Sequence, residues 1–149
     1  MSAVPAAGVG VGRPVTRPPF PYFGGKMRLA ARLVGLLPAH AHYVEPFAGS
    51  LAVLMAKPRA AHETVNDLDR DLVTFWRVLR ERPDALERAC GLTPHARAEH
   101  ADAKDPDQAP DDVELARRVW VRLTQGRAAV MGATGWRYYA DPVGSASMP

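Results

Sequence analysis

The chain has 149 residues, of which 47% are hydrophobic, and it carries a net charge of +3. This length allows one modest domain with a buried core, and no run of about 18 apolar residues predicts a membrane span. The single cysteine, Cys90, excludes an internal disulfide and a multi-cysteine zinc cluster, and it fits a reducing cytoplasm. Residues 1–18 are interpreted as a flexible leader, because they lack the continuous apolar core of a signal peptide.

The predicted elements alternate between helix and strand over the first half of the chain. Apolar spacing and proline stops predict, in chain order, a helix over 24–38, a strand over 42–47, a helix over 50–57, a strand over 63–66 and a helix over 69–81. Asp69 and Asp71 fall in the first turn of the last helix, where the helix dipole favours negative charge. This alternation favours parallel strands joined by right-handed crossovers, and therefore an α/β fold.

The second half is predicted to be mostly helical. Residues 83–92 add a short helical piece, residues 95–112 form a polar and irregular connector, and residues 113–125 return to a helix. The residues that follow lack periodicity but are rich in glycine, arginine and aromatic side chains.

Charge is segregated along the chain. Residues 1–60 hold seven basic residues and one acidic residue, residues 61–112 hold seven and thirteen, and residues 113–149 hold five and two. The two basic ends are suited to a polyanion, with the acidic middle facing water. Solvated protein faces often show the same segregation, so this alternative stays open.

The ends of the two predicted strands bring polar and glycine residues to one edge of the sheet. In an open α/β sheet the ligand lies beyond the carboxyl ends of the strands. The first strand runs into Glu45, Phe47 and Gly49, and the second is followed by Asp67, which lies 18 residues after Gly49. An acid at this distance is placed to accept hydrogen bonds from both hydroxyls of a ribose. Gly49 allows a ligand to approach the backbone closely.

The charge of Glu45 indicates which ligand fits this edge. A phosphate-binding loop uses several glycines and a helix N-terminus aimed at the anion, whereas here a carboxylate lies at the same place. This favours a ligand with a cationic part, such as S-adenosylmethionine, which has a ribose, an adenine, an ammonium group and a sulfonium. Phe47 can pack beside the adenosine. The alternative is an ordinary strand–turn–helix with a stray acid.

The stretch PYFGGKMRL (21–29) adds a cation and an aromatic ring to the same hypothesis. Its two glycines free the backbone, Lys26 supplies a positive charge for the carboxylate of the cofactor, and Tyr22 supplies the ring. The other interpretation is a glycine turn followed by a helix with an exposed lysine.

Three motifs in this order, PYFGGK, YVEPFAGSLAV and NDLDRDLVTFWRVLR, resemble the opening motifs of the Dam-like adenine-N6 DNA methyltransferases over about residues 20–82. The resemblance implies a partial Rossmann-like, S-adenosylmethionine-dependent methyltransferase fold, followed by the start of a mostly helical target-recognition region. It implies cofactor contacts by the residues that match the three motifs: Tyr22, Lys26, Glu45, Phe47, Gly49 and Asp67. Leu51 departs from the glycine that the family often has at that position.

The family performs its chemistry with an Asp-Pro-Pro-Tyr motif, which these 149 residues lack. In that motif the aspartate and a proline carbonyl accept the N–H bonds of adenine N6, and the tyrosine stacks on the flipped base. The nearest match, Asp141-Pro142, lacks the second proline and the aromatic residue, so Asp141 is a degenerate catalytic candidate interpreted as part of a turn. The sequence therefore predicts the N-terminal part of a longer methyltransferase, inactive alone, whose catalytic motif lies in a missing segment or a second polypeptide.

Basic residues after position 113 match the start of target recognition in that family. Candidates for contacts with DNA phosphates, against the alternative of a solvated helix face, are Arg118, Arg122, Arg127 and Arg137. The aromatic residues Trp136, Tyr138 and Tyr139 are interpreted as structural, and the five histidines show no metal-ligand spacing.

The predicted organisation is a leader over 1–18, a cofactor-binding part over 19–92, and a connector with a partial target-recognition region over 93–149. Three functions remain compatible with it: the adenine-specific methyltransferase acting on DNA, an inactive remnant that holds cofactor or DNA, and an unrelated nucleotide-binding α/β protein. Because only two strands are predicted, the helices have too little sheet to cover. We therefore expect exposed apolar surface and poor solubility.

Overall fold

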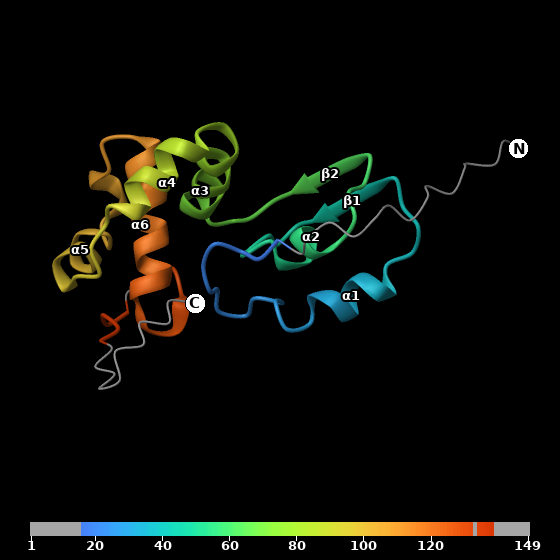
Figure 1. Ribbon diagram of the computed structural model, residues 1–149, viewed down its shortest axis with the longest axis horizontal. Helices are drawn as coiled ribbons and strands as arrows, with labels where there is room; N and C mark the ends of the chain where they lie inside the picture. Colours follow the sequence, from blue (N-terminus) through green and yellow to red (C-terminus); the bar gives the residue numbers. More distant parts are fainter. Residues whose placement is uncertain (1–15, 133, 139–149) are drawn as a thin grey trace, which may run out of the picture.

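The structure is a computed structural model, and it describes residues 16–132 and 134–138. A half that holds both strands is followed along the chain by a helical half (Figure 1). The elements are, in order, α1 (Ala30–Leu36), β1 (His42–Glu45), α2 (Ala52–Ala56), β2 (His62–Val65), α3 (Arg70–Glu81), α4 (Pro83–Gly91), α5 (Arg97–Asp102), η1 (Pro106–Gln108), α6 (Asp112–Gln125) and η2 (Arg127–Ala129).

The two strands form a parallel pair, as the sequence predicts. His42 lies opposite His62, and Glu45 lies opposite Val65. Side chains alternate between the two faces of a strand, and Glu45 accepts a hydrogen bond from the backbone N–H of Leu54 in α2. Tyr43 and Glu45 therefore point to the α2 side of the sheet, and α2 in turn packs against α1. Both strands end at the same edge, where the predicted site lies.

The core of the helical half is made by α3, α4 and α6. Its buried side chains are Leu72, Phe75, Val78, Leu86, Ala116, Val119 and Leu123. Two aspartates cap the long helices: the Asp69 carboxylate accepts hydrogen bonds from two N–H groups in the first turn of α3, and Asp111 does the same for α6. The cap places Asp69 just before α3 rather than inside its first turn.

The segment before the first helix is anchored on the helical half. Phe20 is 2% exposed, and its ring centroid lies 4.9 Å from that of Phe75 and 5.3 Å from that of Trp76. Trp76 Nε1 also donates a hydrogen bond to the carbonyl of Gly49 over 3.0 Å. Both the N-terminal segment and the turn after β1 are therefore held against α3.

The structure corrects two predicted elements. The helix expected over 24–38 begins only at Ala30, because Gly24 adopts a φ of +73° and the residues around it form turns. The connector expected over 95–112 contains α5 and η1. His100 and Ala103 are buried there, and the backbone N–H of Ala96 is held by the Gln125 side chain of α6. This contact comes from a distant part of the chain, so the local pattern does not reveal it.

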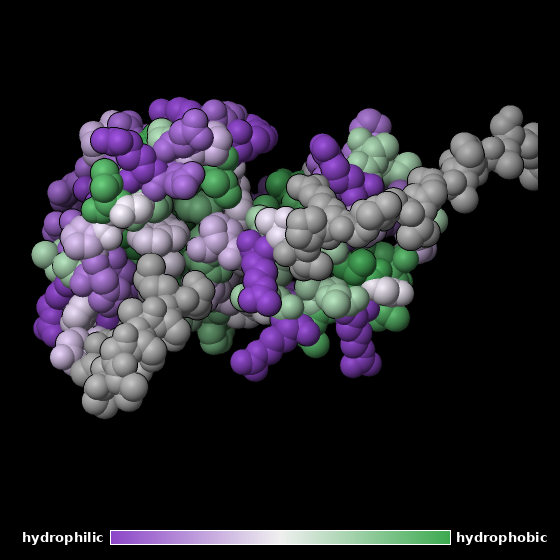
Figure 2. Space-filling model, in the orientation of Figure 1, coloured by the Kyte–Doolittle hydropathy of each residue, from purple (hydrophilic) through white to green (hydrophobic). Residues whose placement is uncertain are grey.

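Apolar side chains are exposed on the first half, as expected from its small sheet. Val44 on β1 is 54% exposed, Val65 on β2 is 43% exposed, and Leu36 on α1 is 74% exposed. Figure 2 shows hydrophobic residues on the surface of this half and hydrophilic residues gathered over α3 and α4. No helix within the described residues is long and apolar enough to cross a membrane.

Candidate functional site

The turns that follow β1 and β2 are tied together by hydrogen bonds. The backbone N–H of Ala48 donates to the carbonyl of Asn66 over 2.9 Å, and the Asn66 side chain donates to the carbonyl of Pro46 over 3.3 Å. The backbone N–H of Gly49 donates to Asp67 Oδ2 over 2.9 Å. The two strand ends therefore form one rigid edge, with the predicted residues of both strands side by side.

Gly49 can be replaced by no other residue without strain. Its φ is +48°, in the left-handed region that favours glycine. A Cβ added there would lie 3.1 Å from a ring carbon of Tyr22. Because Gly49 has no side chain, the Tyr22 ring can cover the turn. The PYFGGK motif therefore packs onto the YVEPFAGSLAV motif.

Leu51 shows why glycine suits its position. Leu51 has a φ of +54° and precedes α2 without capping it by its side chain. The residue is only 5% exposed, so burial compensates for an unfavourable backbone conformation. The left-handed backbone is therefore retained despite the departure from glycine.

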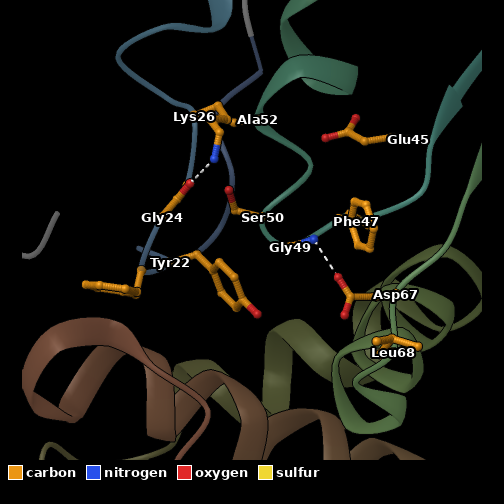
Figure 3. A pocket seen from close by; sticks show the side chains of 13 residues that line it. Tyr22, Gly24, Lys26, Glu45, Phe47, Gly49, Ser50, Ala52, Asp67 and Leu68 are labelled. Atoms are coloured by element: carbon orange, nitrogen blue, oxygen red, sulfur yellow. Dashed lines mark hydrogen bonds between the residues drawn. The ribbon is translucent and has the colours of Figure 1, made fainter.

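The carboxylate of Glu45 takes the place of the missing cap. Its Oε2 accepts hydrogen bonds from the Tyr43 hydroxyl over 3.0 Å and from the N–H of Leu54 over 3.2 Å. Burial raises the pKa of Glu45, while these two hydrogen bonds and the charge of Lys57 act in the opposite direction. Figure 3 shows Glu45 on one side of the pocket and Lys26 and Gly24 on the opposite side.

The Gly-Gly-Lys stretch forms a tight loop over the other side of the pocket. A Cβ at Gly25 would lie 2.8 Å from the carbonyl of Tyr22, so only glycine fits there. Lys26 Nζ donates to the carbonyl of Gly24 over 2.5 Å. The N–H of Phe23 donates to the carbonyl of Ala129 over 2.8 Å, which fixes the loop to the helical half. The Lys26 ammonium is thereby held at the rim of the pocket.

These segments enclose a pocket of about 360 Å³ (Figure 3). This volume lies within the range of about 300–1,000 Å³ that is usual for small-molecule sites. All six residues predicted to contact the cofactor line it: Tyr22, Lys26, Glu45, Phe47, Gly49 and Asp67. Two carboxylates, one ammonium and exposed aromatic rings therefore face a single cavity. Phe23, Phe47 and Leu68 are each more than 70% exposed and give the cavity an apolar rim.

Asp67 also accepts hydrogen bonds from the backbone, which the sequence did not predict. Besides the bond from Gly49, its Oδ1 accepts a hydrogen bond from the backbone N–H of Asp69 over 3.0 Å. A carboxylate offers about four acceptor positions, so both oxygens retain capacity for a hydroxyl group. The Asp67 and Asp69 charges also contribute to a raised pKa of Tyr22, after the larger effect of burial.

Sequence reasoning missed two contributors to the site. Ser50 lines the pocket and is 4% exposed, and its Oγ lies 3.2 Å from where a Cβ of Gly25 would be. The second is Trp76 of α3, whose indole N–H donates a hydrogen bond to the Gly49 carbonyl. Only the adjacency of Ser50 to Gly49 could have signalled the first, and no local signal marks the second.

Two of the four arginines predicted to contact DNA phosphates form ion pairs within the helical half. Arg122 is 7% exposed, and its Nη2 lies 2.8 Å from Asp71 Oδ2. Arg118 donates to Glu114 Oε1 over 2.9 Å and to the carbonyl of Asp105. Arg122 is thus paired with α3, whereas Arg118 is paired with a glutamate of its own helix, α6.

The other two arginines flank a short hairpin after α6. Arg127 is exposed at the start of η2, and its N–H donates to the carbonyl of Gly135 over 2.9 Å. The N–H of Arg137 donates to the carbonyl of Gln125 over 2.7 Å. The Trp136 ring packs at a tilt against the His95 ring, with centroids 5.3 Å apart, which fits its structural interpretation. The degenerate candidate Asp141, and Tyr139, lie outside the described residues.

The comparison with known proteins points to one family. The model for the D12 class of N6 adenine-specific DNA methyltransferases matches residues 22–108, more than half of the chain. The matched range begins at Tyr22 and includes all the pocket residues. No curated protein sequence matches this chain.

Proposed function

Because this chain belongs to the D12 class of N6 adenine-specific DNA methyltransferases, we propose that its pocket binds S-adenosylmethionine for the methylation of adenine N6 in DNA. Membership of this family removes the alternative of an unrelated nucleotide-binding protein. The observation that carries the proposal is the convergence of six motif residues, from three separate segments, on one cavity at the carboxyl ends of two parallel strands. A partial Rossmann-like arrangement of these strands is part of the same proposal.

The residues present fit the chemistry of this cofactor. Asp67 retains acceptor positions for the ribose hydroxyls, and Lys26 offers an ammonium for the methionine carboxylate. Glu45 offers a carboxylate for the cationic part, and the exposed ring of Phe47 offers a surface for adenine. When bound, the cofactor supplies a methyl group on a sulfonium, a neutral sulfide being the leaving group.

Calorimetry with S-adenosylmethionine tests this assignment on the full chain. We expect saturable binding by the wild type and roughly tenfold weaker binding by Lys26→Ala and by Asp67→Ala. Arg28→Ala is the matched control, because Arg28 is an exposed cation two residues away that does not line the pocket. Absence of wild-type binding, or unchanged affinity in both pocket variants, would contradict the proposal.

The transfer step requires groups that this sequence does not contain. Without Asp-Pro-Pro-Tyr, the chain has no side chain of that motif to accept the N–H bonds of adenine N6. We propose that the motif and additional strands come from another segment or from a second polypeptide, which would also cover the exposed Val44 and Val65. A reading frame downstream that encodes Asp-Pro-Pro-Tyr supports this, and its absence favours an inactive cofactor- or DNA-binding remnant.

For contact with DNA we propose Arg127 as the residue best placed among the four predicted arginines. It is exposed next to the Ala129 carbonyl that holds the pocket loop at Phe23. Arg127→Ala should weaken duplex binding and lower the salt dependence of log K by about one unit of slope. Arg88→Ala, an exposed arginine on α4, should leave the slope unchanged. Equal slopes in both variants and the wild type would remove Arg127 from the interface.

A further inference from the structure

Tyr43 is attached to Glu45 through both the strand and a hydrogen bond. The two residues are two positions apart on β1, so their side chains share one face. The Tyr43 hydroxyl donates to Glu45 Oε2 over 3.0 Å, and the N–H of Leu54 donates to the same oxygen over 3.2 Å. Donors from two elements thus fix one carboxylate oxygen. The other, Oε1, accepts no hydrogen bond from the part of the chain that the structure describes, and Glu45 lines the pocket.

We propose that Tyr43 is a positioning residue for ligand binding, whose hydroxyl holds the Glu45 carboxylate charged and oriented with one oxygen free for the cationic part of the methyl donor. This inference rests on the proposed function of the pocket. It extends that function to a side chain that lies outside the pocket lining.

The Tyr43 ring is itself held in place by a buried cation. Lys57 Nζ lies 4.5 Å from the centroid of the ring and 2.5 Å from Glu63 Oε1 on the neighbouring strand. The Lys57 side chain is 1% exposed, so this cation–π contact is shielded from water. The hydroxyl is therefore presented to Glu45 from a ring that Lys57, itself paired with Glu63 of β2, holds in place.

The charge states of both partners agree with this arrangement. Burial, followed by the charge of Glu45, raises the pKa of Tyr43 well above its ordinary value, so the hydroxyl remains a donor. The charged groups around Glu45 are Lys57 after α2, Glu63 on β2, and Lys26 and Asp67 at the pocket. Because burial raises the pKa of Glu45, each donor to its carboxylate helps to keep it ionised.

The substitution Tyr43→Phe tests the proposal, since it removes the hydroxyl and keeps the ring over which Lys57 lies. As the pH falls, protonation of Glu45 should abolish binding of S-adenosylmethionine. The loss of one donor raises the Glu45 pKa, so in Tyr43→Phe this should happen at a higher pH than in the wild type. We expect the midpoint of this loss to move upward by about one pH unit. Adenosine, which has no ammonium or sulfonium, should show no such shift. Tyr138→Phe, which changes an exposed tyrosine, should leave the wild-type profile unchanged.

A second measurement follows the Glu45 carboxyl carbon by NMR in the ligand-free proteins. A higher Glu45 pKa in Tyr43→Phe, together with the shifted binding profile, supports the proposal. An unchanged Glu45 titration or an unchanged binding profile in a folded Tyr43→Phe overturns it. In that case, binding of S-adenosylmethionine by the wild type still supports the proposed function. If the wild type binds no S-adenosylmethionine, the proposed function fails and the ligand-binding role of Tyr43 fails with it.

Discussion

Gly49 donates its backbone N–H to the carboxylate of Asp67 over 2.9 Å, and this bond joins the turn after β1 to the turn after β2. The same carboxylate accepts the N–H of Asp69, the residue that caps α3. A single side chain therefore connects the glycine turn, the second strand end and the start of a long helix. The geometry of the pocket depends on this connection whichever ligand occupies it.

Asp67→Asn should destabilise the protein even without a ligand. An amide has one acceptor oxygen, so it can serve only one of the two N–H groups that Asp67 now binds. We expect a loss of about 1–2 kcal/mol in the free energy of unfolding, measured by urea denaturation. Asp107→Asn is the control, because Asp107 is exposed on η1 and does not contact the pocket. Equal stability of the two variants would show that the connection contributes nothing.

Gly49→Ala should be costly for two separate reasons. The new Cβ would force an alanine into a φ of +48° and would lie 3.1 Å from the Tyr22 ring. The backbone alone costs about 1–2 kcal/mol, and displacement of the ring should also disturb the pocket. Gly35→Ala is a matched control in the last turn of α1, where an added Cβ meets nothing within 4 Å. We expect Gly35→Ala to be neutral or slightly stabilising. Similar thermal stability of both variants would contradict this account.

At Leu51 we expect the glycine variant to be more stable than the alanine variant, the reverse of the usual order within a helix. Leu51→Ala should lose about 2–4 kcal/mol of burial and keep the unfavourable φ of +54°. Leu51→Gly loses the same burial but relieves the backbone, so it should be about 1 kcal/mol more stable than Leu51→Ala. At Val53, within α2, glycine should instead be less stable than alanine. Urea denaturation of the four variants decides between these orders.

The location of the site could be predicted because strand ends meet at one edge. The parallel pairing of β1 and β2 follows from the alternation of elements, and it brings Glu45 and Asp67 to the same cavity. The left-handed turn at Gly49 agrees with the same local pattern. The spacing of the motifs predicts the location of the site because each strand and each turn is determined by residues close together in the sequence.

The arrangement of the helical half depends on contacts that local patterns do not contain. Arg122 is paired with Asp71, 51 positions earlier in the chain, so its basic character did not reveal its buried place. α5 forms in a polar stretch because its start is held by Gln125, 29 positions later. A side chain that looks solvated in sequence is thus buried when a distant partner compensates its charge.

The ion pairs on α6 predict a pH-dependent stability that is independent of the pocket. Hydrogen bonds from Arg117, and then from Arg118, lower the pKa of Glu114 to about 2. Because the folded pKa lies below the ordinary value of 4.5, the stabilisation is complete above about pH 4.5 and is lost as the pH falls towards about 2. Glu114→Gln removes this titration. We therefore expect the wild type to be the more stable protein at neutral pH, and the difference to shrink progressively below about pH 4.5 in urea denaturation. For the control Asp107→Gln, which removes an exposed carboxylate, the difference in stability from the wild type should hardly change with pH. If the difference for Glu114→Gln is also constant with pH, the Glu114 carboxylate is not stabilised by folding.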